Sequence, residues 1–177
     1  MNVVSKRYAK ALLDALSPEK AEAGLSQLRQ LSDMLAREPD MRKLLEQPAF
    51  PPDRRESFLG SIADALDLEA PVRKLFSMLV DRRRIAILNE IVEACQAQLD
   101  ERTGTLRVKV TSAGPLGEAE KSEITERLGR STGKRVVMEV DHDASIIGGL
   151  VVRVGSTVMD ASLRQQLASF QRRLLAD

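Results

Sequence analysis

The sequence is poor in the side chains that most often carry catalysis or bind metals. Its 177 residues include one His, one Cys, one Tyr and no Trp. A single Cys cannot form a disulfide within the chain, and together with one His it cannot complete a His/Cys zinc site. Any Ser/His/Asp or Cys/His arrangement would depend on His142 alone. The composition therefore favours a non-catalytic protein with no metal and no cofactor.

An excess of charge of one sign is also missing. There are 27 Lys and Arg residues against 26 Asp and Glu residues, which gives a formal net charge of +1. Proteins dedicated to nucleic acids usually carry a basic excess, and those that bind single strands use aromatic stacking platforms. With aromatic residues at 3% of the chain, we expect no nucleic-acid partner.

Long hydrophobic runs are absent as well. The sequence contains no stretch of 18 apolar residues, which is about the length needed to span a bilayer. The first sixteen residues, MNVVSKRYAKALLDAL, lack the apolar run of a secretion signal. We therefore expect no direct membrane insertion, and a protein that stays in the compartment where it is made.

Helical periodicity dominates the first hundred residues. In the first helix, Val4, Tyr8, Ala11 and Ala15 recur at the spacing of one helical face. Prolines and capping residues divide the region. The first helix is expected to end near residue 17. Five more are expected at about 19–37, 41–46, 53–66, 71–80 and 85–99.

The pattern changes at Thr103-Gly104. Leu106, Val108 and Val110 alternate with polar residues, which predicts a half-buried strand. The region beyond predicts a weaker helix, three further strands and a last helix, at about 117–130, 136–140, 146–154, 157–159 and 163–174. The fold class is therefore α+β, with a helical domain over 1–104 and a small α/β domain over 105–177.

Two helices are apolar over an unusually wide arc. In the first helix and in Val72–Val80, apolar side chains cover roughly 200° of the circumference, whereas a helix on one core needs a little over 100°. Two interpretations stay open. Both helices are enclosed by their own bundle, or a groove between them receives an amphipathic helix from a partner.

Two motifs that suggest chemistry fail on closer reading. The stretch 129–135, GRSTGKR, is one residue too short for a phosphate-binding loop, and Arg135 replaces the Ser or Thr that would hold Mg²⁺. The triplet Asp141-His142-Asp143 cannot easily converge on one ion, because its side chains are consecutive. We interpret the two as a helix end and a turn; a hydrolase dependent on His142 is a remote alternative.

The basic run Arg82-Arg83-Arg84 lies between two predicted helices. It fits an exposed corner whose charge favours the end of a helix. It also fits a contact with RNA or acidic lipid, so an RNA- or ribosome-associated helical adaptor is the alternative function. Cys95 lies on an apolar helix face and is expected to be a buried, unreactive thiol.

Five segments together carry a family resemblance: 7–12, 81–88, 104–116, 143–155 and 158–164. The most specific is 143–155, DASIIGGLVVRVG. In this order and spacing, the chain resembles the delta subunits of bacterial F-type ATP synthases and the mitochondrial oligomycin-sensitivity-conferring protein.

The resemblance implies an N-terminal six-helix bundle, a small C-terminal α/β domain and no catalysis. It implies a stator subunit of a proton-translocating ATP synthase, which joins the top of the catalytic alpha/beta hexamer to the membrane-anchored peripheral stalk. Rotation is thereby coupled to ATP synthesis. The implied location is peripheral, on the cytoplasmic side of the cell inner membrane.

The resemblance also implies two partner sites. A groove between the first and fifth helices would bind the N-terminal helix of the alpha subunit, with Tyr8, Ala11 and Met78 as its lining. Neighbours inferred from helical phase are Val4, Leu12, Ala15, Leu75 and Leu79. The C-terminal half would hold the b subunits of the stalk through an apolar helical stripe: Leu163, Leu167, Phe170 and Leu174. The same stripe would fit packing on the domain's own sheet equally well.

Overall fold

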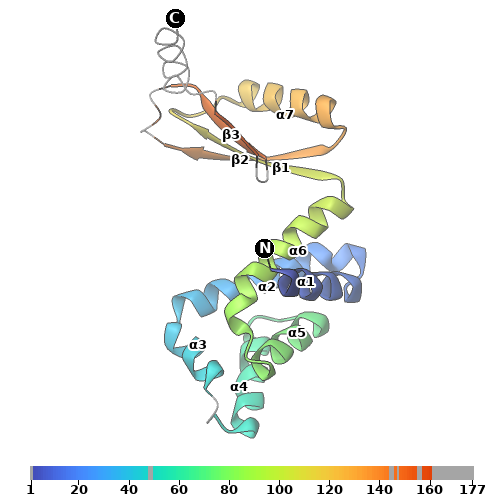
Figure 1. Ribbon diagram of the computed structural model, residues 1–177, viewed down its shortest axis with the longest axis vertical. Helices are drawn as coiled ribbons and strands as arrows, with labels where there is room; N and C mark the ends of the chain where they lie inside the picture. The colour runs from blue at the N-terminus through green and yellow to red at the C-terminus, as the bar shows by residue number, and fades with distance from the viewer. Residues whose placement is uncertain (1, 48–49, 144–145, 147, 155–156, 161–177) are drawn as a thin grey trace, which may run out of the picture. The chain divides into compact units, whose positions relative to one another are not determined.

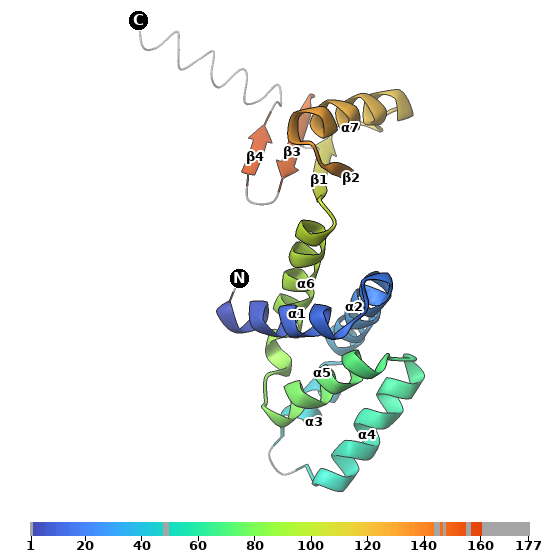
Figure 2. The same ribbon diagram turned by 90° about the vertical axis from the view of Figure 1, so that its right-hand side faces the viewer.

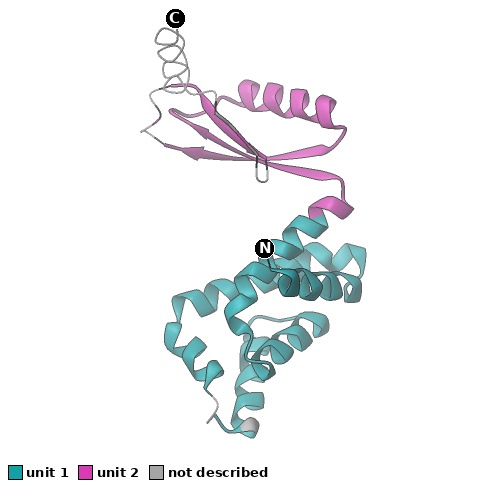
Figure 3. Cartoon of the chain, in the orientation of Figure 1, with its two compact units in different colours: residues 1–99 teal, residues 100–177 magenta. Residues whose placement is uncertain are grey.

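The protein is described here by a computed structural model, which covers residues 2–47, 50–143, 146, 148–154 and 157–160. The chain divides into two compact units, residues 1–99 and 100–177 (Figure 3). The first is helical and the second contains a mixed sheet with a helix, so the expected α+β class is confirmed. The boundary expected at 104 lies just after the last turn of α6 (Leu88–Arg102), the helix that runs across the division.

Within its described residues the first unit is built from six α-helices and two short 3₁₀ turns (Figure 1). Prolines lie in the first turn of several of these elements. The N–H groups of a first turn have no acceptor within the helix, so a residue without an N–H loses no hydrogen bond there. Besides α6, the elements are α1 (Val3–Ala15), η1 (Pro18–Lys20), α2 (Ala21–Arg37), α3 (Pro39–Glu46), α4 (Pro52–Ala65), α5 (Ala70–Asp81) and η2 (Ile85–Ile87).

One core fills the first unit, and every one of its α-helices contributes to it. The largest fully buried side chain is Phe76 of α5. Leucine supplies most of the rest, in the three-and-four spacing that the sequence shows. Residues that are less than 3% exposed include Ala9, Leu28, Leu31, Leu45, Ala63, Phe76, Leu79 and Ile91.

The second unit holds a four-stranded sheet in the order β2-β1-β3-β4 (Figure 2). Its strands are β1 (Thr105–Ser112), β2 (Arg135–His142), β3 (Leu150–Val154) and β4 (Thr157–Asp160). Strand β1 is parallel to β2 and antiparallel to β3, and β4 pairs antiparallel with β3. Parallel neighbours need a long crossover, which α7 (Glu118–Thr132) provides.

The predicted alternation along β1 is confirmed. Val108 and Val110 are buried on one face of the sheet, and Lys109 between them is exposed on the other. On that polar face the Lys109 ammonium lies 2.6 Å from an Asp141 carboxylate oxygen on β2. The sheet therefore has one apolar face and one solvated face, as antiparallel and mixed sheets allow.

The strand predicted over 146–154 is shorter than expected. The Ile146 N–H donates to the Asp143 carbonyl at 3.1 Å and not to a neighbouring strand, and β3 begins only at Leu150. Gly149 has a φ of 88°, a left-handed value that an extended strand cannot contain. The glycine pair 148–149 thus lies before the strand and not inside it.

The final predicted helix, with Leu163, Leu167, Phe170 and Leu174, lies outside the described residues. Among the helices that are described, none combines the length and apolarity needed to cross a bilayer.

Candidate functional site

A cavity of about 350 Å³ lies between α1 and α5, two helices that pack side by side in the first unit (Figure 2). We call it the α1–α5 groove. It includes Tyr8, Ala11 and Met78, which the family resemblance placed there, and Val4, which helical phase added. Its lining consists of Val4, Arg7, Tyr8, Ala11, Met78, Arg82 and Arg84.

Helix α1 begins at the groove. Its N-cap is Asn2, whose side-chain oxygen accepts the Val4 N–H at 3.1 Å and so satisfies one of the free donors of the first turn. Val4, Tyr8 and Ala11 follow at intervals of four and three residues, so they share the side that faces the groove. Advancing one residue turns the side chain by about 100°. That shift places Ser5, Ala9 and Leu12 in the bundle interior.

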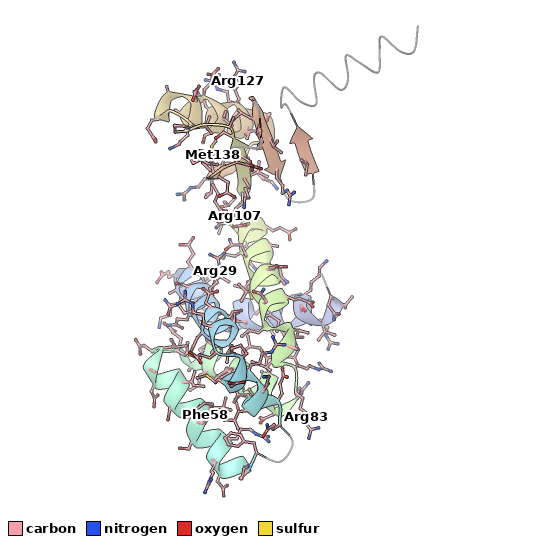
Figure 4. All side chains as sticks on the ribbon, turned by 90° about the vertical axis from the view of Figure 1, so that its left-hand side faces the viewer. Arg29, Phe58, Arg83, Arg107, Arg127 and Met138 are labelled. Carbon is pink, nitrogen blue, oxygen red and sulfur yellow. The ribbon has the colours of Figure 1, made fainter. Side chains whose placement is uncertain are left out.

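The end of α5 shapes the other wall. The Arg83 N–H donates to the Val80 carbonyl at 2.9 Å, and the Arg84 N–H donates to the Leu79 carbonyl at 2.7 Å. Arg83 has a φ of 54°. These bonds and this left-handed residue form a Schellman motif, which ends the helix and reverses the chain. All three arginines are exposed, but only Arg82 and Arg84 line the groove. Arg83 lies at the turn after α5 (Figure 4).

The groove combines apolar side chains with positive charge. Val4, Tyr8 and Met78 are half-buried, so each keeps apolar surface open. The Arg84 Nη1 donates to the Tyr8 hydroxyl at 3.3 Å, which holds the two side chains together at the rim. Among the lining residues there is no carboxylate. Within the described residues, no group of three His, Cys, Asp or Glu side chains is placed to hold a metal ion.

Four residues expected at this interface lie elsewhere in the first unit. Leu12, Leu75 and Leu79 are 4%, 3% and 0% exposed and belong to the core beneath the groove. Ala15 is exposed but does not line the cavity. Around the axis of α5, the side-chain directions of Leu75 and Leu79 differ from that of Met78 by about 60° and 100°. These differences are enough to turn both leucines from the groove toward the core. Part of each wide apolar arc is therefore core, and part is open.

The sequence reasoning missed Arg7, and it treated Arg82 and Arg84 as a separate corner. Arg7 lies three residues after Val4 and four before Ala11, so its helical phase already indicated the same side. No comparable signal existed for Arg82 and Arg84, because their position depends on the left-handed turn at Arg83.

The remaining motifs have structural explanations. Gly133, with a φ of 66°, is the C-cap of α7, so the stretch 129–135 is a helix end and turn as predicted. Cys95 is fully buried, and this burial raises the pKa of its thiol to about 12, which keeps it neutral and unreactive. Asp141 and His142 are both exposed and form the end of β2.

Comparison with known proteins gives consistent matches over the whole chain. The family model described as "ATP synthase delta (OSCP) subunit" matches residues 4–174. A subunit named ATP synthase subunit delta from Anaeromyxobacter sp. (strain Fw109-5) is 36% identical over 175 residues, which cover 98% of each chain. The protein of the same name from Geotalea uraniireducens is 34% identical over 171 residues, covering 96% of this chain and 95% of the relative.

Among solved structures, a chain in the Toxoplasma gondii mitochondrial ATP synthase hexamer aligns with a TM-score of 0.70 at 23% identity. The alignment covers 99% of both chains. At this identity the likeness bears on the fold alone.

Proposed function

The chain belongs to the ATP synthase delta (OSCP) subunit family, and from this membership we propose that its α1–α5 groove binds the N-terminal helix of an alpha subunit. As a member of this family it is a non-catalytic stator subunit, which links the F1 part of ATP synthase to the peripheral stalk. The finer assignment of its partner subunits is the proposal.

The observation that carries the proposal is the open apolar surface of the groove. Val4, Tyr8 and Met78 come from two helices and face one cavity without being covered by the chain's own described residues. An amphipathic helix laid into such a groove buries its apolar stripe at about 25 cal/mol per Å² of apolar area, reduced by the entropy of association. This is the established helix-in-groove mode of recognition.

A stator needs binding that survives torque. The proton-driven shaft turns inside the catalytic hexamer, and the hexamer turns with it unless something holds it still. A connector therefore needs slow dissociation and no active site. The composition, with one His and one Cys, agrees with that task.

The second unit completes the connection in this proposal by holding the ends of the b subunits. Leu163, Leu167, Phe170 and Leu174 are the candidates, on the strength of their helical spacing in the sequence. In this proposal the boundary between the two functional parts lies at residue 104. The protein is then bound peripherally, on the cytoplasmic side of the inner membrane. Because the chain belongs to the ATP synthase delta (OSCP) subunit family, the RNA-adaptor alternative is not retained.

Calorimetric titration of the full-length protein with an alpha-subunit N-terminal peptide from the same organism tests the groove. Tyr8→Asp and Met78→Asp should each weaken binding by about 100-fold or more, because each replaces apolar contact surface with a hydrated carboxylate that must lose its water against the peptide's apolar stripe. The matched control is Val3→Asp: Val3 is 72% exposed on the same helix and does not line the groove. Far-UV circular dichroism checks the fold. Wild-type affinity in both groove variants would exclude this site.

A further inference from the structure

We propose that Arg7, Arg82 and Arg84 make the α1–α5 groove selective for an amphipathic helix that carries carboxylates beside its apolar stripe. The inference rests on the proposed helix-binding function and specifies the chemistry of the occupant. It concerns selectivity, and the apolar contacts supply most of the affinity.

The charge on the residues that line the groove is of one sign, although the chain as a whole is nearly neutral. Three guanidinium groups line the cavity, and no lining residue carries a negative charge. In the described part of the chain, none of these three arginines forms an ion pair. Other arginines of the protein do pair: Arg42 with Glu46, Arg73 with Asp64 and Arg107 with Asp100.

The backbone and one hydrogen bond position these cations. The Schellman turn brings Arg82 and Arg84 to the groove while leaving Arg83 outside it. The Tyr8 hydroxyl accepts from Arg84 Nη1 at 3.3 Å and so holds that guanidinium next to the apolar lining. A guanidinium has five N–H donors in a planar fork, and one such bond leaves donors for a carboxylate.

The position of these arginines also indicates what kind of helix fits. Arg7 belongs to α1, whereas Arg82 and Arg84 follow α5, so positive charge comes from both walls. An amphipathic helix that buries its apolar stripe presents its flanking residues to both walls. Carboxylates at those flanks meet guanidinium groups, whereas flanking Lys or Arg residues meet like charge, which costs affinity.

The test uses full-length protein and two synthetic amphipathic peptides with the same apolar stripe. One carries Glu at the positions that flank the stripe, and the other carries Gln there. Fluorescence anisotropy measures both affinities at low and at high salt. The Glu peptide should bind about tenfold more tightly at low salt. This preference should largely disappear at about 1 M salt, where the Debye length is about 3 Å.

Variants assign the preference to individual side chains. Arg82→Gln combined with Arg84→Gln should abolish most of the preference for the Glu peptide, and Arg7→Gln should reduce it. Arg83→Gln is the matched control, because Arg83 is an exposed arginine of the same run that does not line the groove. It should leave the preference unchanged.

The outcomes separate this inference from the function on which it rests. Equal binding of the two peptides, binding of neither, or an equal loss of preference in Arg83→Gln overturns the charge selectivity. Met78→Asp tests whether the peptides bind in the α1–α5 groove at all. If it weakens both peptides while the Glu preference is absent, the groove stands and the charge selectivity falls. If it leaves a strong Glu preference unchanged, the peptides bind elsewhere and both proposals fall.

Discussion

The Ser5 hydroxyl donates a hydrogen bond to a Glu90 carboxylate oxygen at 3.0 Å and so joins α1 to α6. Ser5 is fully buried and Glu90 is half-buried. Ser5 follows Val4 directly, so the bond fixes the inner side of the helix whose outer side lines the α1–α5 groove.

Ser5→Ala should lower the free energy of unfolding by about 1–2 kcal/mol, because it leaves a half-buried carboxylate without this donor. Urea unfolding followed by circular dichroism measures the change. Ser61→Ala is the control, because the exposed Ser61 hydroxyl donates to the Ser57 carbonyl within α4 and so joins no two helices. That variant should change stability by less than about 0.5 kcal/mol. Equal effects of the two substitutions would contradict a special role for the α1–α6 bond.

Gly24 and Gly60 both lie inside helices and should respond in opposite ways to alanine. A Cβ on Gly24 would lie 2.6 Å from the Leu16 Cδ1, and Leu16 is itself only 6% exposed. A Cβ on Gly60 meets nothing within 4 Å. Gly60→Ala should therefore add about 0.5–1 kcal/mol of stability, since Ala favours helices more than Gly does. Gly24→Ala should cost about 1–3 kcal/mol through overpacking. A similar gain at both positions in urea unfolding would show that Leu16 moves aside freely.

Arg83→Gly should stabilise the protein by about 1 kcal/mol. The φ of 54° at Arg83 forces its Cβ toward the backbone, and glycine lacks that Cβ. The comparison is Arg82→Gly, one residue earlier, where φ is −87° and glycine relieves no strain. Thermal unfolding of both variants tests this relief of strain: only Arg83→Gly should raise Tm. A lower Tm in that variant would mean that the arginine side chain itself stabilises the turn.

Cys95 should resist thiol reagents in the folded protein. Burial raises the pKa of its thiol to about 12, whereas an unfolded thiol ionises near 8.5. At about pH 8 a disulfide reagent should therefore react far faster in concentrated urea than in buffer. Comparable rates in both would contradict the burial.

The same shift makes stability depend on alkaline pH. Because the folded pKa lies above the unfolded one, the stabilising contribution is complete below about pH 8.5 and is lost as pH rises toward about 12. The loss reaches at most about 1.4 kcal/mol per pH unit. Urea unfolding across this range should fall less steeply for Cys95→Ala than for the wild type. Parallel curves would show that the thiol ionises over the same pH range in the folded and unfolded protein, which would contradict the raised pKa.

Much of the fold follows from local signals in the sequence. Pro39, Pro52 and Pro71 lie in first turns, and the alternation through Val108 and Val110 produces a strand with one buried face. The strand predicted from residue 146 begins only at Leu150, because apolar composition does not mark where a strand starts. Only the backbone angle at Gly149 does so.

By itself, the sequence determined the helical and α/β parts, the scarcity of catalytic and metal-binding side chains, the two helices with excess apolar surface, and the family. Only the tertiary structure decided which part of that surface is open. Val4, Tyr8 and Met78 face the groove, whereas Leu12, Leu75 and Leu79 are core. The reason is that periodicity gives each side chain an angle on its own helix, but which neighbour covers that angle depends on how the helices pack. The same packing, with the left-handed turn at Arg83, brings Arg7, Arg82 and Arg84 from distant parts of the chain to one cavity.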